Sequence, residues 1–179
     1  MSLPSSRNTT YAPGSQVLSA DLNAIQDGVV NLYAGYHQQI TIQIPAVLGS
    51  AQDSTASWAK PPGSAYISYN TGGADDVWHV PIVLRQGQRI KACRGYVRDN
   101  SGSGGTVVTM TLRKGKTTGT ESSIGSPAAS SGAGADQTLT IGSLTEVVGA
   151  GESFYLTFAA DKAQTCRVYM IEVDVDAVP

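Results

Sequence analysis

Histidine and cysteine are the side chains best suited to catalysis and to transition-metal binding, and this chain has only two of each. Neither His37 nor His79 has a cysteine, histidine or glutamate nearby at ligand spacing. Cys93 and Cys166 are too far apart for a metal knuckle, so we expect small apolar core residues or a bridge between neighbouring strands. The chain also lacks a Gly-x-Ser-x-Gly motif. We predict that it is not an enzyme and uses no metal and no cofactor.

A hydrolase with an unfamiliar site remains the enzymatic alternative. Such a site would require a deep polar cleft beside His37 or His79, whose pKa would be shifted there.

Acidic side chains could bind a hard cation such as calcium, because carboxylate oxygens are the ligands that this ion prefers. Asp75 and Asp76 lie in a glycine-flanked turn, and Glu172, Asp174 and Asp176 alternate with apolar residues near the end of the chain. Acidic residues that alternate with isoleucine and valine also form the solvated face of a strand. We favour that interpretation over a metal site.

Three aromatic residues surround the turn Pro61-Pro62-Gly63, and they are the candidate ligand contacts: Trp58, Tyr66 and Tyr69. Aromatic rings exposed on a β-sandwich can stack on sugar rings, and they are equally common in cores and interfaces. They therefore define the alternative hypothesis, a monomeric carbohydrate-binding module.

The charge composition argues against nucleic acid as a partner. The chain has 12 basic and 14 acidic residues and a formal net charge of -2, whereas phosphate binding requires clustered lysine and arginine. No apolar run approaches the roughly 18 residues of a membrane span, and the first residues lack the apolar stretch of a signal peptide. We expect synthesis in a bacterial cytoplasm and no membrane insertion.

The first part of the chain predicts an arm and a helix. Residues 1–18 are rich in Ser, Thr, Asn and Pro and should be extended. Ser19 is a good N-cap for a helix within residues 19–37. Its apolar residues follow the three-four spacing of a heptad seam: Leu22, Ile25, Val29, Leu32 and Tyr36. This seam could align copies of the chain or pack on the chain's own β domain, and we favour self-association.

From residue 38 to 179 the hydrophobic period changes to two, which predicts about eight short antiparallel strands in a jelly-roll-like β-sandwich. The Gly- and Ser-rich segment from Lys114 to Gln137 should be a long exposed loop or contain one weak edge strand. Around Val168 to Ile171 successive residues are all apolar, so we expect a neighbouring subunit or a long loop to cover both sides of the strand.

The segment from Tyr11 to Asp27, with the sequence YAPGSQVLSADLNAIQD, resembles one near the start of tail-fibre and other appendage proteins of bacteriophages and prophage-derived particles. The resemblance implies an arm that anchors to other virion structural proteins, and a short helix before a trimeric β domain. Our leading hypothesis is therefore a homotrimeric phage or phage-like appendage, a short fibre, head fibre or decoration protein. It would reside in the virion and present its sandwich for attachment, with a host-surface glycan as a candidate partner.

Overall fold

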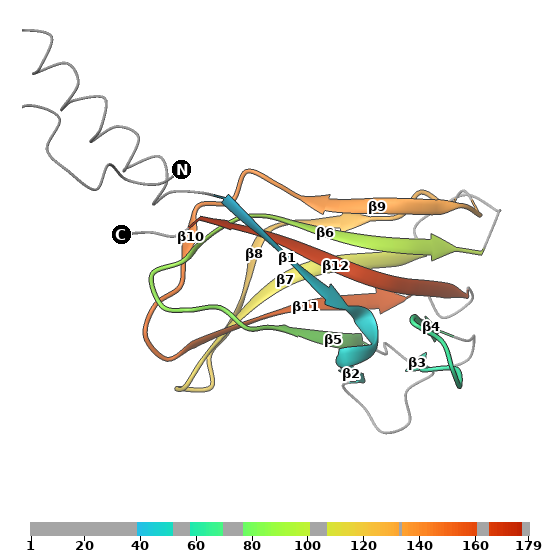
Figure 1. The fold of residues 1–179 in the computed structure, drawn as a ribbon, viewed down its shortest axis with the longest axis horizontal. Coiled ribbons are helices and arrows are strands. Elements are labelled where there is room, and N and C mark those ends of the chain that lie inside the picture. Colours follow the sequence, from blue (N-terminus) through green and yellow to red (C-terminus); the bar gives the residue numbers. More distant parts are fainter. Residues whose placement is uncertain are drawn as a thin grey trace, which may run out of the picture. The chain divides into compact units, whose positions relative to one another are not determined.

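The computed structural model describes residues 39–51, 58–69, 77–100, 107–132, 134–160 and 165–176. These residues form two antiparallel β-sheets that pack face to face (Figure 1), which confirms the predicted mainly β sandwich. The arm at 1–18, the helix at 19–37 and its five seam residues lie outside the described residues, as does His37. None of the helices in the described ranges is long and apolar enough to cross a bilayer.

Sheet A has seven strands, and β12 lies at its centre, paired with β6 on one side and with β1 and β4 on the other. Its strands are β1 (Gln39–Pro45), β3 (Trp58–Ala59), β4 (Ile67–Tyr69), β6 (Arg89–Asp99), β9 (Asp136–Ile141), β10 (Glu146–Val147) and β12 (Cys166–Asp176). A single 3-10 turn, η1 (Ala46–Leu48), follows β1.

Sheet B has five strands in the order β2-β5-β11-β7-β8. Its strands are β2 (Ser50–Ala51), β5 (Val77–Ile82), β7 (Val108–Lys116), β8 (Glu121–Ala129) and β11 (Glu152–Ala160). Strand β8 is the edge strand expected within the segment from Lys114 to Gln137, and most of its residues are exposed. An edge strand pairs with a neighbour on one side only, and most side chains of β8 are exposed. This position explains why the segment has few large apolar residues.

The core lies between the sheets and consists of the inward residues of the alternating strands, such as Ile90, Val97, Leu112, Leu156 and Val173. The sheets approach closely at Gly95, where a Cβ atom would lie 2.6 Å from Met110 Sδ and 3.0 Å from Phe158 Cε1. Glycine at this position thus lets β6 pack directly on two large core side chains.

Both cysteines are buried and neither forms a disulfide bond. Of the two predicted roles, they are therefore core residues and not a bridge between strands. Burial is the main cause that raises the pKa of Cys93, and likewise of Cys166, to about 12. The neighbouring carboxylates of Asp174 and Asp99 act in the same direction.

We expect both thiols to resist Ellman's reagent in the folded protein at pH 8 and to react within seconds after unfolding in guanidinium chloride. The reactive thiolate should be roughly a thousandfold scarcer in the folded state, because its pKa is about 12 instead of the usual 9.0. A rapid stoichiometric reaction of the folded chain would contradict the burial of these strands.

Candidate functional site

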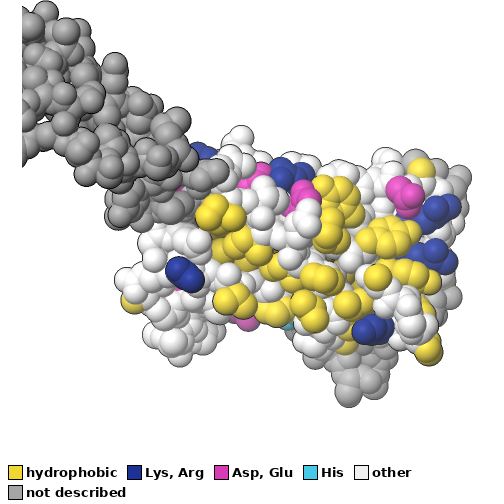
Figure 2. Space-filling model, viewed as in Figure 1, with side chains coloured by type: hydrophobic (Ala, Val, Ile, Leu, Met, Phe, Trp, Pro, Cys, Tyr) yellow, Lys and Arg dark blue, Asp and Glu magenta, His cyan; other side chains and the backbone are white. Residues whose placement is uncertain are grey.

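The outer face of sheet A presents side chains in rows, because paired residues on neighbouring strands point to the same side of a sheet. At one end, β9, β6, β12 and β4 contribute Asp136, Arg98, Arg167 and Ser68 in successive register. We call these four residues the arginine row. In the view of Figure 2, hydrophobic side chains run as a band across the described surface, with charged side chains along its margin.

A β-bulge places aromatic and apolar side chains beside the arginine row. Val168 pairs with Val97 and Met170 pairs with Tyr96, so Tyr169 is the extra residue of β12. Tyr169 and Met170 are both half-buried, which indicates that both side chains reach the outer face. The bulge gives a local reason for the run of apolar residues from Val168 to Ile171, for which the sequence predicts cover by a neighbouring subunit or a long loop.

Tyr66, which immediately precedes β4, extends this aromatic surface. Its ring meets the ring of Tyr169 edge to face at a centroid distance of 5.8 Å. The Arg167 guanidinium lies over Tyr66, with Cζ 4.9 Å from the ring centroid. These contacts hold two half-buried tyrosine rings in fixed positions on the outer face.

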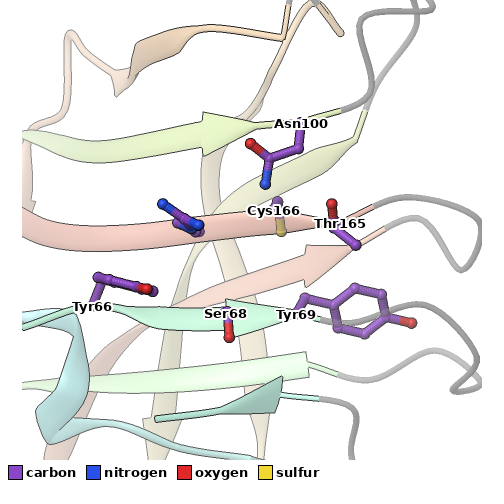
Figure 3. Close-up of a pocket in the computed structure, with 7 residues that line it drawn as sticks. Tyr66, Ser68, Tyr69, Asn100, Thr165 and Cys166 are labelled. Atoms are coloured by element: carbon purple, nitrogen blue, oxygen red, sulfur yellow. The ribbon is translucent and has the colours of Figure 1, made fainter. Parts of the chain in front are cut away.

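A hollow of about 220 Å³ lies beside Tyr66. Figure 3 shows Ser68 of β4, Asn100 after β6 and Thr165 before β12 around this hollow. The described residues that line it are Tyr66, Ser68, Tyr69, Asn100, Thr165, Cys166 and Arg167. The hollow thus combines an aromatic edge with hydroxyl, amide and guanidinium groups, and none of these described lining residues is acidic.

A second hollow of about 330 Å³ lies where β6, β9 and β12 meet. Its lining residues are Tyr96, Val97, Asp136, Gln137, Thr138, Tyr169 and Met170. Tyr169 lines this hollow and contacts Tyr66, which lines the first one. The two tyrosines therefore separate two neighbouring hollows on one face.

At the other end of the face, Arg94 holds two carboxylates. Its guanidinium donates a bidentate pair of 2.8 Å hydrogen bonds to Asp174 and a 3.1 Å bond to Glu172. Thr41 also donates to Asp174, and Tyr96 and Gln43 donate to Glu172. The hydrogen bond from Arg94 lowers the pKa of Asp174, and the bond from Tyr96 is the main cause that lowers the pKa of Glu172.

This network explains two members of the acidic triplet in the sequence. Asp174 is only 5% exposed, so it is not part of a solvated face, and its partner is arginine. The third member, Asp176, lies 3.6 Å from Lys91 Nζ. Among the residues that the structure describes, no group of three or more His, Cys, Asp or Glu side chains is arranged to hold a metal ion. Asp75 and Asp76 lie outside the described ranges.

A buried carboxylate at the end of β6 fixes the segment between β8 and β9. Asp99 is fully buried and accepts hydrogen bonds from the backbone N–H groups of Gly132 and Gly134, at 3.1 and 2.5 Å, and from the side-chain amide of Gln137. Gln137 also accepts a 2.9 Å bond from the Ser131 N–H. Asp99 thereby positions Gln137, which lines the second hollow.

The outer face of sheet B has a different character. The rings of His79 and Tyr155 stack at a centroid distance of 5.2 Å and an interplanar angle of 24°. Burial lowers the pKa of His79, and burial together with the neighbouring Glu121 carboxylate raises the pKa of Tyr155 to about 12. The pKa of His79 is therefore shifted, as an enzymatic site would require. The Tyr155 ring that stacks on His79 accounts for part of its burial.

Of the three predicted aromatic contacts, Tyr66 and Tyr69 line the first hollow, but only Tyr66 is not buried. Tyr66 is half-buried, whereas Trp58 is 5% exposed and Tyr69 is fully buried. Trp58 pairs with Tyr69 across β3 and β4, and its ring lies 6.3 Å from that of Trp78, so these rings pack inside the sandwich. This burial corrects the expectation that Trp58 and Tyr69 are exposed stacking platforms.

Sequence reasoning missed Tyr96, Tyr169 and Arg167, which come from two paired strands and face outward together. The apolar run around Tyr169 was the available signal, because a break in strict alternation is typical of a bulge.

No family model matches the chain, and no curated protein matches it. The resemblance to phage appendage proteins, the homotrimer and the virion location therefore stay predictions from the sequence.

Solved structures share the architecture. The chain resembles the C-terminal CBM6 of LamC, a marine laminarinase from Zobellia galactanivorans, with a TM-score of 0.52 and 11% identity over 75% of this chain and 98% of that one. It is also similar to the carbohydrate-binding module CBM36 solved with calcium and xylotriose, with a TM-score of 0.49 and 12% identity over 74% and 98% of the two chains. For the xylan-binding module CBM15 the TM-score is 0.48, with 10% identity over 77% and 97%. At these identities the LamC module shows a shared β-sandwich fold and nothing more.

Proposed function

We propose that this chain is a non-catalytic carbohydrate-binding module that holds a glycan on the outer face of sheet A. The observation that carries the proposal is the pair of tyrosines, Tyr66 and Tyr169, that stand edge to face between two hollows on one sheet face. This is the alternative hypothesis from the sequence, with a different set of contact residues.

Sugar rings present C–H groups on their faces and hydroxyl groups around their edges, and the described face offers partners for both. A tyrosine ring covers the apolar face of a sugar and removes it from water. Ser68, Asn100 and Thr165 line the first hollow, and Gln137 and Thr138 line the second. These neutral donors and acceptors can hydrogen-bond to hydroxyl groups on either side of the stacked ring.

The rigidity of the platform favours binding. Tyr66 is held between Tyr169 and Arg167, and Tyr169 is held in a bulge whose partner strand carries Tyr96. Side chains that are already ordered lose little conformational entropy when a ligand binds. A site on paired strands therefore suits the weak contacts that a glycan makes.

The shared fold with the CBM6 module of LamC supports the proposal, since it shows that such a sandwich can serve in a carbohydrate-binding module. The non-catalytic assignment is our inference from the site chemistry. The groups around the two tyrosines suit hydrogen bonding and stacking, and among the described residues that line the hollows Asp136 is the only carboxylate.

The proposal predicts that the full chain is retarded in native gels that contain a polysaccharide, with laminarin, xylan and polygalacturonate as the first panel. Tyr66→Ala and Tyr169→Ala should each lower the association constant for the retained polysaccharide roughly tenfold, because each removes an aromatic contact of about 1.5 kcal/mol. Isothermal titration calorimetry would measure the constants, and the circular dichroism of each variant would report folding.

Tyr155→Ala is the matched control, because it removes a half-buried tyrosine from the outer face of sheet B. It should leave retention unchanged. Selective loss of binding in Tyr155→Ala, with normal binding in the two sheet A variants, would move the site to the other sheet. A wild-type chain that no polysaccharide retards would refute the proposed function.

A further inference from the structure

The charges on the outer face of sheet A are unevenly distributed between its two ends. At the β1 end, one arginine, Arg94, faces the two carboxylates Glu172 and Asp174, and side-chain hydrogen bonds link all three. At the other end, Arg98 and Arg167 are direct cross-strand partners on β6 and β12. Like charges opposite each other on one face destabilise a sheet, so this pair requires an explanation.

The nearby carboxylate compensates this pair only weakly. Asp136 lies 3.7 Å from Arg98, but the two side chains are 68% and 43% exposed, and an ion pair this exposed contributes little. Within the described residues, no carboxylate lies within ion-pair distance of Arg167. Its guanidinium instead lies against the Tyr66 ring.

The position of Arg167 leaves its donors available. A guanidinium carries five N–H donors, and a contact with one ring face leaves several of them free to bind an acceptor. Arg167 lines the hollow beside Tyr66, together with Ser68 and Asn100. A planar carboxylate in this hollow could accept two parallel N–H bonds from Arg167 while the sugar that bears it rests against the tyrosines.

We propose that the glycan held by this face is acidic, and that the carboxylate of a uronic acid residue binds at Arg167, with Arg98 adding long-range attraction. The proposal rests on the carbohydrate-binding function argued above and names its ligand class. The anion removes the repulsion between the two arginines, so charge complementarity and the aromatic platform favour the same ligand.

The test compares uronate polymers with their carboxyl-reduced forms, which have the same backbone and no charge. Polygalacturonate, alginate and hyaluronate form the panel, and dextran sulfate with dextran tests a sulfate ester in place of a carboxylate. At least one uronate polymer should bind the full chain roughly tenfold more tightly than its reduced form, as expected for a charge-assisted pair. Sodium chloride at 0.5 M, a concentration chosen to screen exposed charges, should weaken that preference roughly severalfold.

Arg167→Gln should abolish the preference for the uronate polymer, and Arg167→Lys should restore only part of it, because lysine keeps the charge but not the planar pair of donors. Arg113→Gln removes the same charge from β7 of sheet B and should change nothing.

The outcomes separate the two proposals. Equal binding of reduced and native polymers, lost in Tyr66→Ala and kept in Arg167→Gln, would overturn the acidic ligand and leave carbohydrate binding intact. Binding of dextran sulfate alone would also overturn the uronate assignment. If neither neutral nor acidic polymers bind, both proposals fail.

Discussion

An Asp99→Ala variant should lose about 3 kcal/mol of folding free energy, since it removes a fully buried carboxylate that accepts three hydrogen bonds. The donors that lose this acceptor are the N–H groups of Gly132 and Gly134 and the amide of Gln137. Urea denaturation followed by tryptophan fluorescence would show the midpoint moving to lower concentration. The segment between β8 and β9 should also become more sensitive to proteolysis.

Asp99→Asn separates the charge from the shape. Asparagine keeps one acceptor oxygen and places an NH₂ group where the second oxygen accepts, so we expect a loss between zero and that of the alanine variant. A decrease below about 0.5 kcal/mol in Asp99→Ala would be typical of an ordinary surface position, and it would show that these hydrogen bonds do not hold the segment in place.

An Arg94→Met variant should be destabilised by about 3 kcal/mol at pH 7, because it leaves Asp174, which is 5% exposed, and Glu172 without their cation. Methionine keeps most of the length of the side chain and therefore isolates the loss of charge and hydrogen bonding. Arg113→Met, on the outer face of sheet B, is the matched control and should cost less than about 1 kcal/mol.

The difference in unfolding free energy between wild type and Arg94→Met should become smaller in acid. In the folded wild type the pKa of Glu172 lies below its usual 4.5 and the pKa of Asp174 below its usual 3.8. As the pH falls, the unfolded chain therefore takes up protons before the folded chain does. The stabilisation is complete above pH 4.5, and it is lost as the pH falls from the usual pKa values to the lowered pKa values of the folded state. Denaturation at pH 7, 5, 4 and 3 measures this trend, and a difference that stays constant would contradict the role of Arg94.

The longer strands could be predicted from the sequence because one face of each is buried, and burial on one face creates a period of two. Strands β2, β3 and β10 have two residues each, too few to show a period. Strand β8 escaped a firm prediction because Ile124 is its only sizeable aliphatic side chain and sits among glycine, serine and alanine.

The site was harder to predict than the fold. Trp58, Tyr66 and Tyr69 lie close together in the sequence, yet the pairing of Trp58 with Tyr69 brings both rings into the core. The residues that form the outer surface come from β4 and the residue before it, β6, β9 and β12, and their neighbourhood depends on which strands pair and in which register. Nothing in the local sequence of Arg98 indicates that Arg167 lies opposite it.

The pairing of β6 with β12 contains two irregularities that offset each other. Tyr169 is an extra residue on β12, and Lys91 is skipped on β6 between the pairs of Ala92 with Asp174 and Ile90 with Val175. The register is therefore the same at both ends of the ladder and displaced by one residue between them. Removing one residue at the bulge would restore regular alternation without reversing any other side chain, so evolution could remodel this surface while leaving the interior of the sandwich untouched.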